Sequence, residues 1–336
     1  MRRRTTLLRR SAFVTTVLVA GSQSVSAHHS TAFYADEFVE LEGEFVRVDW
    51  INPHVRFVLR TTDTKGAEKL WQMEASAISA LERRGVTRDL FKNGERVKIA
   101  GHVSTRDPSQ LQLTNVLFAD GREASLWLDS SPRFKPEVIK TTERVVDAAS
   151  ENRGFFRVWS APRPSPTKIS APFTPAAVDA RKSFDLLDNF ATRCGPQGMP
   201  AVMIAPLPVE FVDRGNEIQV RAEVYDTVRT IHMDRTAPPA GAPPSILGYS
   251  VGKWDNGALV VKTTLIDWPY FDSIGTPQSK DVAIEERYTL SADQTRLDFH
   301  FAIMDPVNLV GTAIVDSHWL ALGATLQRFD CQAPRP

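Results

Sequence analysis

The chain has 336 residues, of which 42% are hydrophobic, and its 40 basic residues balance its 40 acidic residues, so the formal net charge is zero. This composition excludes a disordered chain. The absence of a basic patch and of nucleic-acid-binding signatures argues against nucleic acid as a partner. The length predicts two globular domains.

Residues 1–27 have the three parts of a secretion signal. The first ten residues include five arginines, an apolar stretch runs from Ser11 to Gly21, and Val25-Ser26-Ala27 is a small-residue cleavage pattern. We therefore predict a signal peptide at 1–27 that uses the Sec pathway, with the twin-arginine pathway as the second choice. The mature protein is expected to be periplasmic or secreted. Because no later stretch reaches spanning length, we expect no transmembrane segment after cleavage.

Residues 28–127 are predicted to form an OB-like, five-stranded β-barrel. The expected helix, at residues 76–85, has Ser76 as its N-cap and Gly85 at its C-terminal end. Three strands, a helix and two strands is the order of an OB-type barrel. Alternating apolar and polar residues predict these strands at 39–50, 54–62, 69–75, 96–104 and 111–119.

Residues 128–175 change in character. A charged helical pattern covers residues 136–149, and a proline-rich stretch covers residues 161–172. Proline-rich segments are stiff and extended, so this region is predicted to be a helical and proline-rich linker. A further helical stretch is expected near residues 175–191.

Residues 176–336 are predicted to form an antiparallel β-barrel, lipocalin-like or a sandwich, so the whole chain is expected to be mainly β with few short helices. The chain has two cysteines, Cys194 and Cys331, and in an oxidising compartment we expect them to form a disulfide. About eight strands are expected, at residues 202–215, 216–225, 228–234, 245–255, 257–266, 282–291, 295–305 and 324–331.

The N-terminal part resembles DUF6152, a family of uncharacterised exported bacterial proteins, over residues 27–122. The C-terminal part resembles a second uncharacterised bacterial domain, through GMPAVMIAPLPVEF, RTIHMD and GYSVGKWDNGALVVKT. Neither resemblance implies an activity. The residues that carry the first are His28-His29-Ser30, Gly43, Val46, Trp50, Asn52-Pro53-His54, Trp71, Glu74, Gly85, Gly94 and Gly101.

The candidate metal ligands are His28, His29 and His54. Cleavage after Ala27 would give His28 a free α-amine beside its imidazole, and the Asn-Pro-His turn at His54 would add a further imidazole. Three nitrogens in a T-shape suit copper, with zinc as the second choice. Trp50, Met73 and Glu74 are candidates for a wall or an axial contact. The alternative is a frayed terminus beside a loop histidine.

A second candidate site lies in the C-terminal part, around His232, Asp234 and Arg229. An aspartate beside a histidine can orient it as a general base, and His232 and Asp234 share one face of a strand, whereas Arg229 faces the other side. The PYFD loop adds Tyr270 and Asp272 as ligand-binding candidates. Trp254 is a third, among the aromatic residues that suit an amphipathic molecule. The structural alternative is that Arg229 pairs with Glu223 or Asp226, and that His232 satisfies a buried hydrogen bond.

Three functions are therefore carried forward. The first is a periplasmic binding protein that holds copper at its N-terminal histidines and binds a small molecule or an envelope protein through its C-terminal barrel. The second is an enzyme, a hydrolase, isomerase or lyase, with its chemistry at His232 and Asp234. The third is a structural envelope protein.

Overall fold

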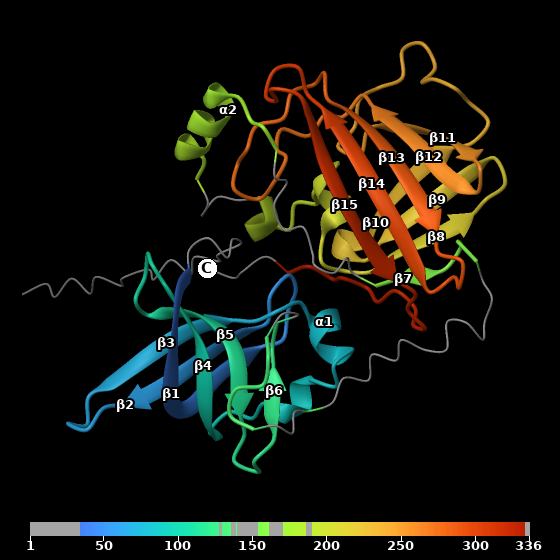
Figure 1. Ribbon diagram of the computed structural model, residues 1–336. Coiled ribbons are helices and arrows are strands. Elements are labelled where there is room, and N and C mark those ends of the chain that lie inside the picture. Colours follow the sequence, from blue (N-terminus) through green and yellow to red (C-terminus); the bar gives the residue numbers. More distant parts are fainter. Residues whose placement is uncertain are drawn as a thin grey trace, which may run out of the picture.

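The computed structural model describes residues 34–127, 130–135, 139, 154–160, 171–185 and 190–332. The predicted signal peptide, His28, His29 and most of the predicted linker lie outside these described residues. The described chain is mainly β and forms two barrels, the first from the N-terminal strands and the second from the C-terminal strands (Figure 1). No helix in the described part is long and apolar enough to cross a membrane.

The N-terminal barrel confirms the OB-like expectation of five strands closed on themselves. Its sheet has the order β3-β2-β1-β4-β5-β6, and a parallel pairing of β3 with β5 closes the first five strands into a barrel. The helix between β3 and β4 is α1 (Ile78–Glu82), followed by the short turn η2 (Arg88–Leu90). The strands are β1 (Tyr34–Asp49), β2 (Arg56–Thr62), β3 (Glu68–Glu74), β4 (Arg96–Ser104), β5 (Gln110–Leu117) and β6 (Glu123–Ser125).

Two glycines allow neighbouring strands of this barrel to approach closely. A Cβ at Gly43 would lie 2.3 Å from the carbonyl oxygen of Arg60, and one at Gly101 would lie 2.1 Å from that of Gln112. The pairing of β4 with β5 shifts register beside Gly101. Bulges and glycines of this kind bend strands, so they help this short sheet to close.

The start of α1 differs from the sequence prediction. The predicted N-cap, Ser76, does not cap the helix, because the helix begins at Ile78 and its N-cap position is Ala77, which has no capping side chain. The N–H of Ile78 instead donates to Oδ1 of Asn52, at 3.0 Å. A residue 26 positions earlier in the chain therefore satisfies the first turn of the helix.

The C-terminal barrel is a nine-stranded sheet in the order β15-β14-β13-β12-β11-β10-β9-β8-β7. A bridge between Trp159 and Ala321 brings its two edges together, so the barrel is nearly closed. Only the pairing of β10 with β11 is parallel among its described ladders, and it covers two residue pairs. The strands are β7 (Val158–Trp159), β8 (Val209–Asp213), β9 (Glu217–Ala222), β10 (Thr227–His232), β11 (Tyr249–Asp255), β12 (Ala258–Thr264), β13 (Ala283–Leu290), β14 (Arg296–Met304) and β15 (Thr312–Leu320).

Three differences from the sequence prediction concern this barrel. β15 was not expected, although its buried residues alternate. The final predicted strand, at residues 324–331, is instead an irregular tail. β7 lies inside the predicted linker, so that segment supplies part of the barrel. The helical pieces around it are short: α2 (Pro175–Ala180), η3 (Arg181–Ser183), η4 (Phe190–Arg193), η5 (Ala201–Ile204) and η6 (Val224–Asp226).

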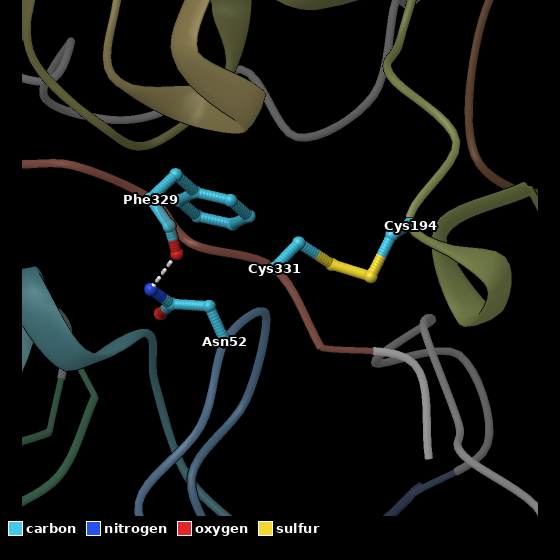
Figure 2. The surroundings of a disulfide bond; sticks show 4 residues. All are labelled: Asn52, Cys194, Phe329 and Cys331. Atoms are coloured by element: carbon cyan, nitrogen blue, oxygen red, sulfur yellow. Dashed lines mark hydrogen bonds between the residues drawn. A yellow bond between two sulfur atoms is a disulfide. The ribbon is translucent and has the colours of Figure 1, made fainter. Parts of the chain in front are cut away.

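The C-terminal tail joins the two barrels, and the predicted disulfide holds it. Cys331 is bonded to Cys194, with 5.7 Å between their Cα atoms. Figure 2 shows the side-chain amide of Asn52, from the N-terminal barrel, donating to the carbonyl of Phe329, two residues before Cys331. The backbone N–H of Gln332 donates in turn to the carbonyl of Asn52, at 3.0 Å.

A buried ion pair lies at the same joint. Both terminal nitrogens of Arg83, just after α1, donate to the carboxylate of Glu223 in the C-terminal barrel. Glu223 also accepts from the backbone N–H of Gln327 in the tail, at 2.9 Å. Because both charges are removed from water, either partner left alone would be strongly unfavourable, and the pair fixes how the barrels meet.

Candidate functional site

An outer polar cluster, formed by Tyr34, His54, Arg56 and Glu74, lies on the surface of the N-terminal barrel. Arg56 of β2 pairs directly with Glu74 of β3, so their side chains share one face of the sheet. The residues next to them, Phe57 and Met73, point into the barrel and are buried. The two-residue period of the strands therefore places Arg56 and Glu74 on the outside.

Tyr34 brings the start of the described chain to this cluster. Its hydroxyl donates to Oε1 of Glu74, at 2.9 Å. Burial raises the pKa of Tyr34, and the adjacent carboxylate raises it further, so the phenol stays protonated as the donor. The first residue of β1 is thereby fixed beside the end of β3.

His54 lies on the same side, two residues before Arg56. Its Nδ1 is 2.8 Å from the carbonyl oxygen of Ala75. A carbonyl can only accept, so in the neutral ring Nδ1 carries the proton and Nε2 carries the lone pair. The ring lies 5.6 Å from that of Trp127, whose indole N–H donates to the carbonyl of Leu113. His54 is thus held in the tautomer that can bind a metal through Nε2.

The charges of the cluster perturb one another. Burial raises the pKa of Glu74, and the opposing effects of His54, Tyr34 and Arg56 do not cancel that rise. Burial lowers the pKa of Arg56, with Glu74 acting in the opposite direction. A partly buried carboxyl with a shifted pKa, beside a histidine, is typical of functional sites and also occurs in structural networks.

Two other predicted neighbours of the metal site do not reach this cluster. Met73 is only 3% exposed and packs in the barrel core. The indole of Trp50 lies 5.8 Å from the ring of Phe91, and its N–H points to Glu82, 3.4 Å away. Trp127 therefore takes the place of the expected aromatic wall.

The described residues alone do not complete a metal site. Within them, no three histidine, cysteine or carboxylate side chains are arranged to hold a metal ion. Of the three predicted ligands, His54 belongs to the outer polar cluster, and the other two, His28 and His29, lie outside the described residues.

In the C-terminal barrel, Arg229 belongs to a buried network and not to a site with His232. Its guanidinium forms a two-pronged ion pair with Glu286, and it also donates to Ser250 and Thr263. Tyr288 donates to the same carboxylate, at 2.5 Å. The expected alternative partners of Arg229, Glu223 and Asp226, are therefore wrong, because cross-strand packing inside the barrel brings Glu286 to it. We call these five residues the inner polar network.

His232 lies on the outer face of β10, as expected from its spacing to Arg229. Its Nδ1 is 3.1 Å from Oε1 of Glu217, and its ring stacks on Tyr249 with 4.5 Å between centroids. Asp234 lies beyond the end of the strand, where its carboxylate is 3.6 Å from Arg235. The residue that orients His232 is thus Glu217, and the predicted group of His232, Asp234 and Arg229 is not assembled.

The three predicted ligand-binding residues, Trp254, Tyr270 and Asp272, have different surroundings. Trp254 is 47% exposed and contacts the edges of Phe155 and Phe156. Asp272 is buried and accepts hydrogen bonds from the N–H and hydroxyl of Thr276, which makes it a turn-forming residue. Tyr270 packs against Phe184 and Trp268. The ring contacts of Trp254 and Tyr270 and the hydrogen bonds of Asp272 thus involve different partners.

Sequence reasoning missed Tyr34, Glu217 and Glu286. Tyr34 and Glu286 contact residues on strands that are distant in the sequence, and Glu217 is the cross-strand partner of His232, which only the register of β9 and β10 reveals. Alternation alone could have predicted that Glu74 and Met73 point to different faces of the sheet, because successive side chains of a strand do so.

The comparisons with known proteins agree with the resemblance of the N-terminal part. Residues 16–112 match the model of DUF6152, a family of unknown function. The match covers β1 to β4 and the first three residues of β5. A search of curated proteins found no match to this chain. The match therefore shows which family this region resembles. It gives no activity, so the chemistry of the region has to be argued from its residues.

Proposed function

We propose that the mature protein is a periplasmic binding protein that holds one copper ion at the outer polar cluster. In this proposal, signal cleavage after Ala27 exposes His28, whose α-amine and imidazole bind the ion together with Nε2 of His54. His29, the adjacent residue, is the second imidazole within reach. Copper is favoured over zinc because an amine and two imidazoles suit the tetragonal geometry of Cu(II).

The observation that carries the proposal is the hydrogen bond between Tyr34 and Glu74. It fixes Tyr34 beside Glu74. His54 lies close enough to Glu74 to lower the pKa of that carboxyl, against the larger effect of burial. His29 precedes Tyr34 by five residues, and five extended residues span up to about 17 Å. The predicted N-terminus therefore has enough chain to return to His54.

The hydrogen bond from His54 to Ala75 supports the same role. Metal-binding histidines commonly donate their second ring N–H to a carbonyl or carboxylate, which fixes the ring and its tautomer. The ring of Trp127 packs beside that of His54, with 5.6 Å between the ring centroids. Both features hold the imidazole of His54 in a fixed orientation.

The C-terminal barrel, in this proposal, binds a small molecule or an envelope protein on its outer surface. Large side chains and the inner polar network fill its interior, including the fully buried Tyr288, Phe301 and Trp319. Trp254 is the largest exposed apolar side chain on this barrel and is the residue we assign to such a contact.

The test is Cu(II) titration of the processed protein against a competing chelator. We expect one ion per chain, and an affinity loss of at least about 100-fold in His28→Ala, in His54→Ala and in a form with one extra residue before His28, because each removes a nitrogen ligand. His300→Ala is the matched control, since His300 also lies beside a carboxylate, Asp316, but on the other barrel. Equal affinity in all five proteins would overturn the proposal.

A second candidate function is an enzyme with His232 as the base. Its support is the contact between Nδ1 of His232 and Glu217, which orients the ring much as Asp234 was expected to do. Incubation of the protein with panels of ester, lactone and epoxide substrates tests it. Turnover that is lost in His232→Ala and reduced in Glu217→Gln would favour the enzyme. If neither turnover nor copper binding is found, a structural envelope role is left.

A further inference from the structure

We propose that the C-terminal tail, residues 323–332, is a redox-controlled clamp between the two barrels. The clamp is closed when Cys331 is bonded to Cys194 (Figure 2). Reduction of this disulfide opens the clamp, so that the tail leaves the joint while each barrel stays folded. The inference goes beyond the proposed function and does not depend on copper.

Single hydrogen bonds, and not a sheet, attach the tail to the barrels, because residues 323–332 form no strand. On the side of the C-terminal barrel, the N–H of Gln327 donates to Glu223, at 2.9 Å. The N–H of Phe329 donates to Asp226, at 3.1 Å. On the other side, the amide of Asn52 donates to the carbonyl of Phe329. Segments held in this way open more readily than the core strands of a barrel.

The turn that receives Phe329 has a strained backbone. Tyr225 and Asp226, between β9 and β10, have positive φ angles of 54° and 49°. Hairpin turns with this backbone favour asparagine and glycine, because most other side chains are disfavoured there. The tail gives both residues a contact, since the ring of Tyr225 lies 4.8 Å from that of Phe329 and Asp226 accepts from its N–H. These contacts offset the strain while the tail is docked, and the turn can relax once the tail leaves.

The two ends of the disulfide have the same backbone feature. Cys194 has a φ of 57°, and Asp330, next to Cys331, has a φ of 37°. Four of the seven non-glycine residues with positive φ in the described chain therefore lie at this joint. Such conformations persist only where the surroundings impose them, and here the covalent bond is the strongest of these constraints. Opening it lets Cys194 and Asp330 relax, which favours release of the tail.

Release of the tail also weakens the contact between the barrels. Glu223 binds Arg83 of the N-terminal barrel and is only 1% exposed with the tail in place. Once the N–H of Gln327 has left, water can reach this carboxylate. Water screens the attraction between two charges, so the ion pair then holds the barrels less firmly.

The reductant that opens the clamp is a dithiol. Both cysteines are partly exposed, as attack by a thiolate requires. One thiolate of the dithiol attacks a sulfur of the disulfide, which gives a mixed disulfide and one free cysteine. The second thiol of the reductant then displaces the other cysteine. Two electrons and two protons end on Cys194 and Cys331, and the reductant leaves as a disulfide.

Hydrogen exchange followed by mass spectrometry tests the clamp in the intact protein, with and without dithiothreitol. We expect peptides that cover residues 323–332 to exchange at least about tenfold faster after reduction, while those that cover β13 and β14 keep their rate. Reoxidation should restore the slow exchange of the tail. The double variant Cys194→Ser/Cys331→Ser should behave like the reduced protein in both conditions.

A turn variant separates the strained turn from the disulfide. Tyr225→Asn/Asp226→Gly gives the turn its favoured residues and removes the tail contacts, so its reduced tail should exchange about three- to tenfold faster than that of the reduced wild type. Asn256→Gly is the matched control, because Asn256 also has a positive φ, 49°, in the hairpin between β11 and β12, where its side chain donates to Asp255. It should leave the exchange of the tail unchanged.

Two results would overturn the proposal. The first is a tail that exchanges as slowly after reduction as before it, because the disulfide would then not hold the clamp. The second is a loss of protection in β13 and β14 together with the tail, because the disulfide would then hold the whole C-terminal barrel and not the tail alone.

Discussion

The two barrels each bring an arginine close to a glutamate, but they use the two residues differently. In the inner polar network, both oxygens of Glu286 bond to Arg229, and Thr263 and Tyr288 complete the set. In the outer polar cluster, Arg56 and Glu74 form no ion pair within the described residues, and a tyrosine alone holds the carboxylate. Charges satisfied by their neighbours specify a fold, whereas a carboxylate with an open oxygen can bind a ligand.

Burial explains why the first pair must be closed and the second can stay open. Arg229 and Glu286 are at most 2% exposed, where an unpaired charge would be very unfavourable. Glu74 lies on the outer face of its barrel and is only partly buried, which is enough to raise its pKa. The comparison predicts opposite effects of substitution in the two places.

The largest expected effect is the loss of stability in Glu286→Ala. This change leaves Arg229 buried without its counter-ion, which typically costs about 3–5 kcal/mol of unfolding free energy. Urea denaturation followed by tryptophan fluorescence measures it. The double variant Arg229→Met/Glu286→Leu should be far less destabilised. A single variant that is as stable as the wild type would mean that the inner network contributes little.

Next in size is the loss of the disulfide between Cys194 and Cys331. Its loop covers 137 residues, and replacing both cysteines by serine should lower the unfolding free energy by about 2–5 kcal/mol. Because Cys331 adjoins the tail residues that contact Asn52, the two barrels should also separate more readily in limited proteolysis. Unchanged protease sensitivity of the tail would show that the disulfide does not hold the joint.

An effect of similar size is expected for Asn52→Ala. This substitution removes the partners of the Ile78 N–H and of the Phe329 carbonyl, and each buried group left without a partner costs about 1–3 kcal/mol. Thermal unfolding should show the loss. Asn52→Asp separates the two bonds, because aspartate can still accept from Ile78 but cannot donate to Phe329. Equal losses in both variants would place the whole effect on the tail contact.

The smallest effect has the opposite sign and concerns Glu74→Gln without metal. Burial raises the pKa of Glu74 in the folded state, so this group lowers the stability of the fold as pH rises from the ordinary carboxyl pKa to the raised one. With a chelator present, the glutamine variant should be at least as stable as the wild type at neutral pH. The difference should vanish below about pH 4, the ordinary carboxyl range. A variant less stable than the wild type at neutral pH would make Glu74 a structural residue.

The sequence predicted the elements better than the contacts between them. Alternation at residues 54–62 and 69–75 located β2 and β3, and the two isolated cysteines indicated the disulfide. The strand at Thr312–Leu320 was missed, and the tail was taken for a strand. The position of the tail depends on its contacts with Asn52 and Glu223, which are distant from it in the sequence. For the same reason the partners of Arg229 and His232 required the sheet register, which no local pattern carries.

The most direct test of the account is the mass of the intact processed protein measured with its metal retained. The account predicts a chain that begins at His28, with one copper ion that His54→Ala loses. A chain that begins at another residue, or copper retained equally after His54→Ala, would contradict it.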